Sequence, residues 1–145
     1  VLLQKEGGFM KHKMRRILLG SLMAMILVCS AFATSDLSAY CEVPAFNGSA
    51  CSEDSGEKET RGSDAYVYDV TVGGGYSVDV RQCVLTSSGG LTAGGAWSGP
   101  ISTTVNAAYV DGTSRMTAGS EVILQFSNAL LTPVAVEVDG TWDTN

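Results

Sequence analysis

Residues 66–80 read Tyr66-Val-Tyr-Asp-Val-Thr-Val-Gly-Gly-Gly-Tyr-Ser-Val-Asp-Val80, and this stretch decides the fold class. Apolar and polar residues alternate on both sides of a glycine triplet, which is the pattern of two β-strands joined by a turn. The row that we expect to face the core consists of Tyr66, Tyr68, Val70 and Val72. A β structure is therefore predicted for this part of the chain.

The alternation continues in both directions from this stretch. Cys83 and Leu85 are one residue out of phase with Val78 and Val80, which predicts a β-bulge near Arg81 and Gln82. Further strands are expected within residues 91–96, 101–109, 121–126 and 134–138, separated by Gly, Pro and Ser clusters. No window of similar length after residue 33 has helical periodicity.

These patterns predict an all-β domain over residues 65–145. Five to six short strands in about 80 residues are typical of a small antiparallel β-sandwich, with a small barrel as the alternative. An immunoglobulin-like or similar topology suits this size, although the Cys-Trp-Cys pattern of true immunoglobulin domains is missing. Residues 34–64 contain few large apolar side chains and many charges, so we expect a polar N-terminal arm and a solvated loop there.

The N-terminal part has the pattern of an export signal. Residues 10–33 combine a basic start, an apolar run and the small-residue ending Ala31-Phe-Ala33, which predicts a signal peptide cleaved after Ala33. An uncleaved membrane anchor and acylation at Cys29 are the alternatives. Lys5-Glu-Gly7, just before Met10, can be encoded by a purine-rich bacterial ribosome-binding sequence, so we expect residues 1–9 to be untranslated. The protein is therefore predicted to be secreted by a bacterium, with no membrane insertion after cleavage.

The charge of the chain argues against two classes of partner. Residues 34–145 contain fourteen acidic and four basic residues, a formal net charge of -10. Such a surface repels phosphate backbones and anionic lipid headgroups. We therefore expect no binding to nucleic acid and no binding to an anionic membrane surface.

Three cysteines follow the predicted signal peptide. In an oxidising compartment Cys41, Cys51 and Cys83 allow one disulfide and leave one thiol. We expect the bond between Cys41 and Cys51, because Pro44 and the Asn47-Gly-Ser turn can reverse the chain between them. A bond from either of these to Cys83 is the alternative, and an exposed thiol that joins two chains is another.

Catalysis has little support in the residues present. Residues 34–145 contain no histidine, which excludes the Ser-His-Asp and Cys-His mechanisms. A pair of carboxylates could hydrolyse a glycoside, and Asp69 and Asp79 on either side of the glycine triplet are the candidates. Alternating strand acids are ordinarily solvent-facing, so we expect a non-enzymatic protein.

Two kinds of binding residue remain. Asp139, Asp143 and Asn145 supply oxygen atoms of the kind that calcium prefers, although the segment lacks the later acid of a complete calcium loop. No other cofactor is expected. Trp97 and Trp142 lie outside the clearest apolar rows and could stack on a sugar, or they could close the ends of the core.

The sequence thus predicts a secreted, non-enzymatic binding module that recognises a carbohydrate or a protein surface. A secreted effector, acting as a toxin or an inhibitor on one protein partner, is a second hypothesis. A subunit of an extracellular assembly, joined by strand addition, is a third.

Overall fold

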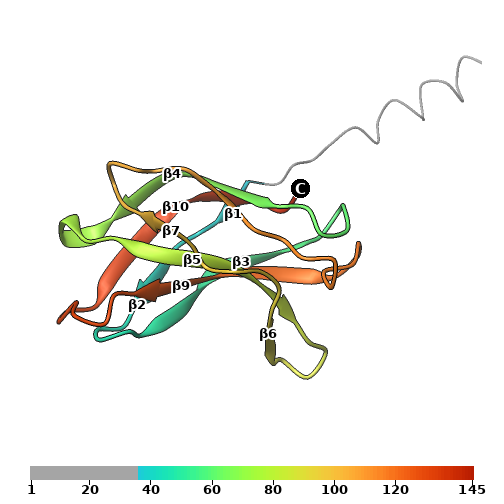
Figure 1. The fold of residues 1–145 in the computed structure, drawn as a ribbon, viewed down its shortest axis with the longest axis horizontal. Coiled ribbons are helices and arrows are strands. Elements are labelled where there is room, and N and C mark those ends of the chain that lie inside the picture. The colour runs from blue at the N-terminus through green and yellow to red at the C-terminus, as the bar shows by residue number, and fades with distance from the viewer. Residues whose placement is uncertain (1–35) are drawn as a thin grey trace, which may run out of the picture. The chain divides into compact units, whose positions relative to one another are not determined.

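The computed structural model describes residues 36–145, which form two antiparallel β-sheets packed face to face (Figure 1). This confirms the all-β class and the sandwich architecture predicted from the sequence. The expected signal peptide, Cys29 and the region before Met10 lie outside the described residues. No helix within residues 36–145 has the length and hydropathy needed to cross a bilayer.

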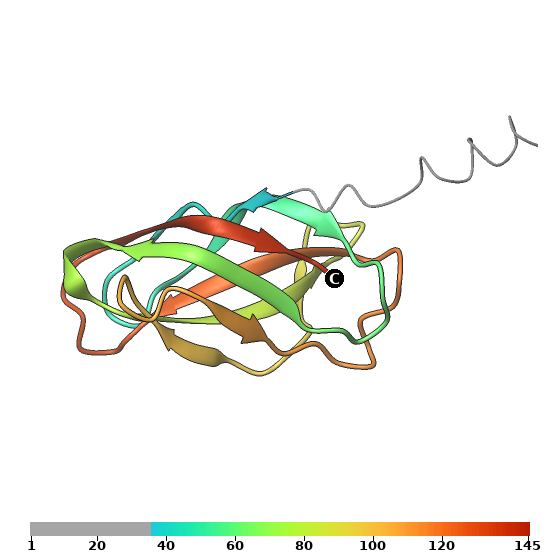
Figure 2. The same cartoon turned by 90° about the horizontal axis from the view of Figure 1, so that it is seen from above.

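The first sheet is here called sheet A, and most of its strands pair with the strand that comes last in the sequence. Its strands are β1 (Leu37–Ser38), β2 (Cys41–Val43), β4 (Ala65–Val72), β8 (Ala108–Val110) and β10 (Val136–Asp143). Strand β10 pairs with β1 and β2 on one side and with β4 on the other, and β8 extends the sheet beyond β4. Strands β4 and β10 run side by side in both views (Figure 2).

The second sheet is here called sheet B, and its strands are β3 (Ser49–Glu57), β5 (Val78–Leu85), β6 (Leu91–Ala93), β7 (Ser98–Ile101) and β9 (Glu121–Asn128). Strands β5 and β9 are drawn below β4 of sheet A in Figure 1. Strand β9 lies between β3 and β5, while β6 and β7 pair with different parts of β5. The glycine triplet forms a short 3-10 turn, η1 (Gly73–Gly75), between β4 and β5. Gly74 and Gly75 there have positive φ, which glycine adopts without a steric penalty.

The core between the sheets is dominated by valine. The fully buried members include Val43, Val67, Val80, Val110, Val122, Val138, Ile101, Leu124, Phe126, Met116 and Trp142. Most of them alternate with exposed residues along their strands, as in Glu121–Asn128, where every second side chain is buried. In β9 the period-two pattern of the sequence therefore specifies which side chains fill the core.

The structure has more strands than the sequence predicted. Residues 36–145 form ten strands, five in each sheet, rather than five to six. The difference arises mainly before Ala65, where the expected arm instead supplies β1, β2 and β3. The nine residues Ser49–Glu57 pair with β9 through backbone hydrogen bonds, although only Ser52 among them is buried. A polar sheet-edge strand of this kind lacks the apolar alternation by which strands are recognised.

The predicted buried row in β4 was wrong at its first two residues. Ala65 and Val67 face the core, whereas Tyr66 and Tyr68 do not. The register between β4 and β10 shifts opposite Gly140, where Asp69 has a φ of 53°. This β-bulge inserts one residue and returns Val70 and Val72 to the core side, so the two ends of β4 are out of phase.

The β-bulge predicted near Arg81 and Gln82 is absent from the pairing of β5 with β9. The register is continuous from Val78 to Val84. Val78, Val80 and Gln82 all point inward, and Cys83 is buried on the other side of the strand. The prediction failed because a glutamine occupies a core position and a cysteine is buried outside the core.

Candidate functional site

Trp97 lies on the outer face of sheet B, immediately before β7. Its side chain is 42% exposed, and the guanidinium carbon of Arg81 lies 4.4 Å from the centroid of its ring. This distance is typical of a cation–π contact, in which the positive charge is attracted to the ring face. Strand β5, which carries Arg81, pairs with β7, so the sheet itself brings the two side chains together.

A ladder of polar side chains holds Arg81 in place. Its Nε donates a hydrogen bond to Oε1 of Gln125 over 2.8 Å, and Nε2 of Gln125 donates to Oγ of Ser49 over 3.2 Å. Arg81 and Gln125 face each other across β5 and β9, and Ser49 belongs to β3 on the far side of β9. Three neighbouring strands therefore fix the guanidinium beneath the indole ring.

This arrangement suits a ligand that carries both hydroxyl groups and apolar ring faces. An exposed tryptophan offers a flat apolar surface for stacking, and Arg81, Gln125 and Ser49 carry donors and acceptors beside it. Asp79 is exposed two residues from Arg81 on the same face of β5. A sugar ring needs this combination of a stacking surface and adjacent hydrogen-bonding groups.

The prediction that Trp142 binds a ligand was wrong. Trp142 is fully buried in the core, and its Nε1 donates a hydrogen bond to the carbonyl oxygen of Ser38 over 3.2 Å. It lies on β10 opposite Leu37 and Val67. The alternative considered for this residue, a place at the end of the core, is the correct one.

The residues proposed for calcium are not gathered at one point. Asp139 and Asp143 both lie on β10, and four residues of extended strand separate their Cα atoms by about 13 Å. The backbone N–H of Asn145 donates to Oδ1 of Asp143 over 2.8 Å, which uses that carboxylate to order the chain end. The segment is a strand rather than a loop, so it does not wrap around an ion.

The expected disulfide is also absent. Cys41, Cys51 and Cys83 are free thiols in the described structure. Cys41 pairs with Val138 in sheet A, whereas Cys51 pairs with Gln125 in sheet B, because the turn between them carries the chain from one sheet to the other. Burial raises the pKa of the Cys41 thiol to about 12, and the charge of Cys51 adds to this effect. Burial likewise raises the pKa of Cys51 and of Cys83.

The two carboxylates considered for glycoside hydrolysis are not neighbours. Asp69 is exposed on sheet A, and Asp79 is exposed on sheet B. The two sheets of a sandwich pack about 10 Å apart, and these side chains point away from the space between them. They do not flank a common ligand.

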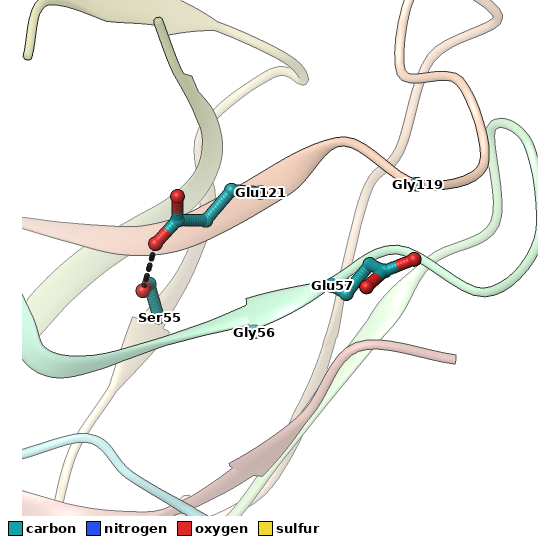
Figure 3. A pocket seen from close by; sticks show the side chains of 5 residues that line it. All are labelled: Ser55, Gly56, Glu57, Gly119 and Glu121. Atoms are coloured by element: carbon teal, nitrogen blue, oxygen red, sulfur yellow. Dashed lines mark hydrogen bonds between the residues drawn. The ribbon is translucent and has the colours of Figure 1, made fainter. Parts of the chain in front are cut away.

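A shallow hollow lies at one edge of sheet B, between the end of β3 and the start of β9. It has a volume of about 350 Å3 and is lined by Ser55, Gly56, Glu57, Gly119 and Glu121. Oγ of Ser55 donates a hydrogen bond to Oε1 of Glu121 over 2.6 Å. Figure 3 shows the Glu57 carboxylate directed away from that pair. The two glutamates therefore do not converge on one ligand.

Lys58 is an unexpected member of the interior, because the sequence places it in an acidic segment. It is fully buried, and its Nζ donates to Oε1 of Gln82 over 3.1 Å and to the carbonyl oxygen of Thr144. Burial lowers the pKa of Lys58, and the charges of Asp64 and Asp143 partly oppose this. Its two acceptors come from β5 and the chain end, so Lys58 ties together three distant segments.

The sequence did not identify Arg81 and Gln125 as candidate binding residues. Arg81 is the one basic residue within the ten strands of residues 36–145. A single basic residue among strands that otherwise carry only acidic charges could therefore have marked Arg81 as a candidate in the sequence. Its partners Gln125 and Trp97 could not be read from the sequence, because they depend on the register of β5 with β9 and β7.

Within residues 36–145, no three His, Cys, Asp or Glu side chains are grouped closely enough to hold a metal ion. In comparisons with known proteins, no family model, no curated protein and no solved structure matches this chain.

Proposed function

We propose that the protein is a secreted, non-enzymatic bacterial binding module that recognises a carbohydrate through the outer face of sheet B. One observation carries the proposal: Trp97 is 42% exposed and is held against Arg81, which Gln125 anchors through a 2.8 Å hydrogen bond. A ring fixed in this way loses little conformational freedom when a ligand binds. Secretion rests on the signal-peptide pattern of residues 10–33.

The mode of recognition follows from the groups on this face. The free side of the indole stacks on the C–H face of a sugar, while Arg81 and Gln125 bind its hydroxyl groups. Trp97 and Arg81 lie on the outer face of a sheet, so the site suits a chain or a terminal sugar lying along the sheet. An immunoglobulin-like topology for the sandwich stays a prediction from the sequence.

The test is a binding screen of the purified chain against immobilised glycans and bacterial wall fragments, with and without a calcium chelator. Trp97→Ala should weaken a saturable hit at least tenfold, as expected for an aromatic hot spot. The matched control is Tyr109→Ala, an exposed aromatic on sheet A, which should leave glycan binding within twofold.

Equal affinities of the wild type and Trp97→Ala would contradict the proposal. A hit abolished by the chelator would place a metal in the site and would contradict direct stacking as its basis. A folded protein that binds no glycan would favour the alternatives: a protein surface as the ligand, an effector that acts on one protein partner, or a subunit of an extracellular assembly.

A further inference from the structure

Three tyrosines form a continuous aromatic surface on the outer face of sheet A, on the opposite side of the sandwich from Trp97. The ring of Tyr66 stacks on that of Tyr68, with centroids 5.6 Å apart and planes 19° apart. It also contacts the ring of Tyr109, with a centroid distance of 4.8 Å. Tyr109 lies opposite Tyr66 on β8 and is 67% exposed. We call these three residues the tyrosine cluster.

The strands around this cluster carry negative charge and no positive charge. The acidic residues of the five strands of sheet A are Glu42, Asp69, Glu137, Asp139 and Asp143. None of these five strands contains Lys or Arg. Glu42 and Glu137 are both exposed and lie directly opposite each other, an arrangement of like charges that destabilises a sheet. The face therefore carries negative charge that its own strands do not neutralise.

Carboxylates also surround the tyrosine cluster itself. Asp143 lies opposite Tyr66 on β10, and the hydroxyl group of Tyr68 donates a hydrogen bond to Oδ1 of Asp36. This hydrogen bond raises the pKa of Tyr68 to about 12, with further contributions from burial and from the charges of Asp36, Asp143 and Asp69. Aromatic rings and carboxylates are thus combined within one small area.

The basic residues of the domain are located elsewhere. Arg81 is on the outer face of sheet B, and Lys58 is buried between the sheets. Arg61 lies in the loop before β4, where its Nε donates to the carbonyl oxygen of Ser114, and Arg115 lies in the loop before β9. Within residues 36–145, no Lys or Arg therefore lies on the strands that carry the tyrosine cluster and its acids.

We propose that the outer face of sheet A is a docking surface for an arginine-rich segment of a partner protein. The planar guanidinium stacks on tyrosine rings and binds carboxylates through two parallel hydrogen bonds. Lysine offers a compact, strongly hydrated charge that stacks less well. This surface is separate from Trp97 and Arg81, so the inference does not depend on carbohydrate binding.

The experiment is titration of the purified chain with a labelled synthetic octa-arginine peptide in 0.15 M salt, followed by fluorescence anisotropy. At this ionic strength charges more than about 8 Å apart are largely screened, which suppresses binding by net charge alone. Tyr109→Ala should weaken saturable binding about fivefold, as one cation–π contact would. Asp143→Asn should weaken it severalfold, and octa-lysine should bind severalfold more weakly than octa-arginine.

Two variants on sheet B serve as matched controls. Glu121→Gln removes one negative charge, and Trp97→Ala removes one exposed aromatic side chain. Both should leave octa-arginine binding within twofold of the wild type. Equal weakening by Glu121→Gln and Asp143→Asn would show attraction to net charge and would overturn the proposal. Unchanged binding by Tyr109→Ala, or no saturable binding by a folded protein, would also overturn it.

Discussion

At the scale of single residues, the least expected feature is a buried ammonium group without a carboxylate hydrogen-bonded to it. Nζ of Lys58 has carbonyl oxygens of Gln82 and Thr144 as acceptors. A buried cation is costly unless its donors are satisfied, so each acceptor contributes more than an ordinary hydrogen bond would. Gln82 is also fixed in turn, because its Nε2 donates to the carbonyl oxygen of Val110 over 2.6 Å.

Replacing this glutamine tests the role of the buried amide. Gln82→Leu retains most of the side-chain volume but removes an acceptor from Lys58 and a donor from the Val110 carbonyl. The free energy of unfolding should fall by about 2 to 3 kcal/mol, measured by urea denaturation. Gln125→Leu, in a less buried position on sheet B, should lower it by less than about 1 kcal/mol. Equal effects of the two substitutions would contradict a special role for Gln82.

The limits of sequence reasoning are clearest for individual residues. Trp97 was correctly placed outside the core rows, because Gly94-Gly-Ala96 precedes it and Ser98-Gly-Pro100 follows it. For Trp142 the sequence left two roles open, and the structure favours the core because Trp142 alternates with Thr141 and Asp143 on β10, which continues past the predicted end of the strand at residue 138. Lys58 could not have been found, because its burial depends on Gln82 and Thr144, which are distant in the sequence.

At the scale of elements, the β-bulge in β4 determines the chemistry of sheet A. Without it, the tyrosines and Val70 would share one face, as the sequence suggested. With Asp69 inserted, Tyr66 and Tyr68 face outward while Val70 and Val72 face the core. The sequence correctly predicted that buried and exposed residues alternate on each side of Asp69. The extra residue in the bulge reverses the faces of the residues before Asp69, so Tyr66 and Tyr68 point outward.

Gly140 makes this bulge sterically feasible. A Cβ at this position would lie 3.1 Å from both Cα and Cγ2 of Val70 and 3.3 Å from the carbonyl oxygen of Tyr68. Gly140→Ala should therefore destabilise the protein by about 2 kcal/mol in urea denaturation, the usual cost of forcing an extra methyl group into a packed site. At Gly73 an added Cβ would meet its nearest atom at 3.5 Å, so Gly73→Ala is the control. A similar cost for both variants would argue against crowding at the bulge.

The longest strand that the sequence did not predict is β3. In β3, only Ser52 is buried among nine residues, so pairing with β9 rather than burial of apolar side chains holds the strand in the sheet. Backbone hydrogen bonds leave no pattern in the sequence. By contrast, β9 alternates buried and exposed residues throughout, and its position was predicted to within two residues.

At the scale of the whole molecule, three thiols couple stability to pH. The pKa of Cys41 is 9.0 in the unfolded chain and about 12 in the folded protein, because burial disfavours the thiolate. The unfolded chain therefore loses its proton first. The stability that the buried thiol contributes is complete below pH 9 and is lost as the pH rises through 12.

This linkage predicts how a cysteine variant behaves. The difference in unfolding free energy between the wild type and Cys41→Ala should shrink from pH 9 upward, as measured by urea denaturation at a series of pH values. Val43→Ala is a matched truncation on the same strand without an ionisable group, and its difference from the wild type should stay constant. A Cys41→Ala difference that does not change with pH would indicate that the Cys41 sulfur carries no titratable proton.

The sandwich presents two outer faces of different chemistry. Sheet B carries Trp97 with its anchored arginine, and sheet A carries the tyrosine cluster among carboxylates. The composition predicted an acidic all-β binding protein but not this division, because the face of each side chain depends on the register between strands. The proposed recognition of a carbohydrate depends on the outer face of sheet B.

Iodide quenching of tryptophan fluorescence, with and without a glycan, tests whether sheet B binds a carbohydrate. The chain has two tryptophans, and Trp142 is fully buried, so iodide reaches only Trp97. A glycan that binds on sheet B should reduce quenching in a saturable manner, with the same dissociation constant as direct binding gives. Glycan binding that leaves the quenching of Trp97 unchanged would contradict the proposal.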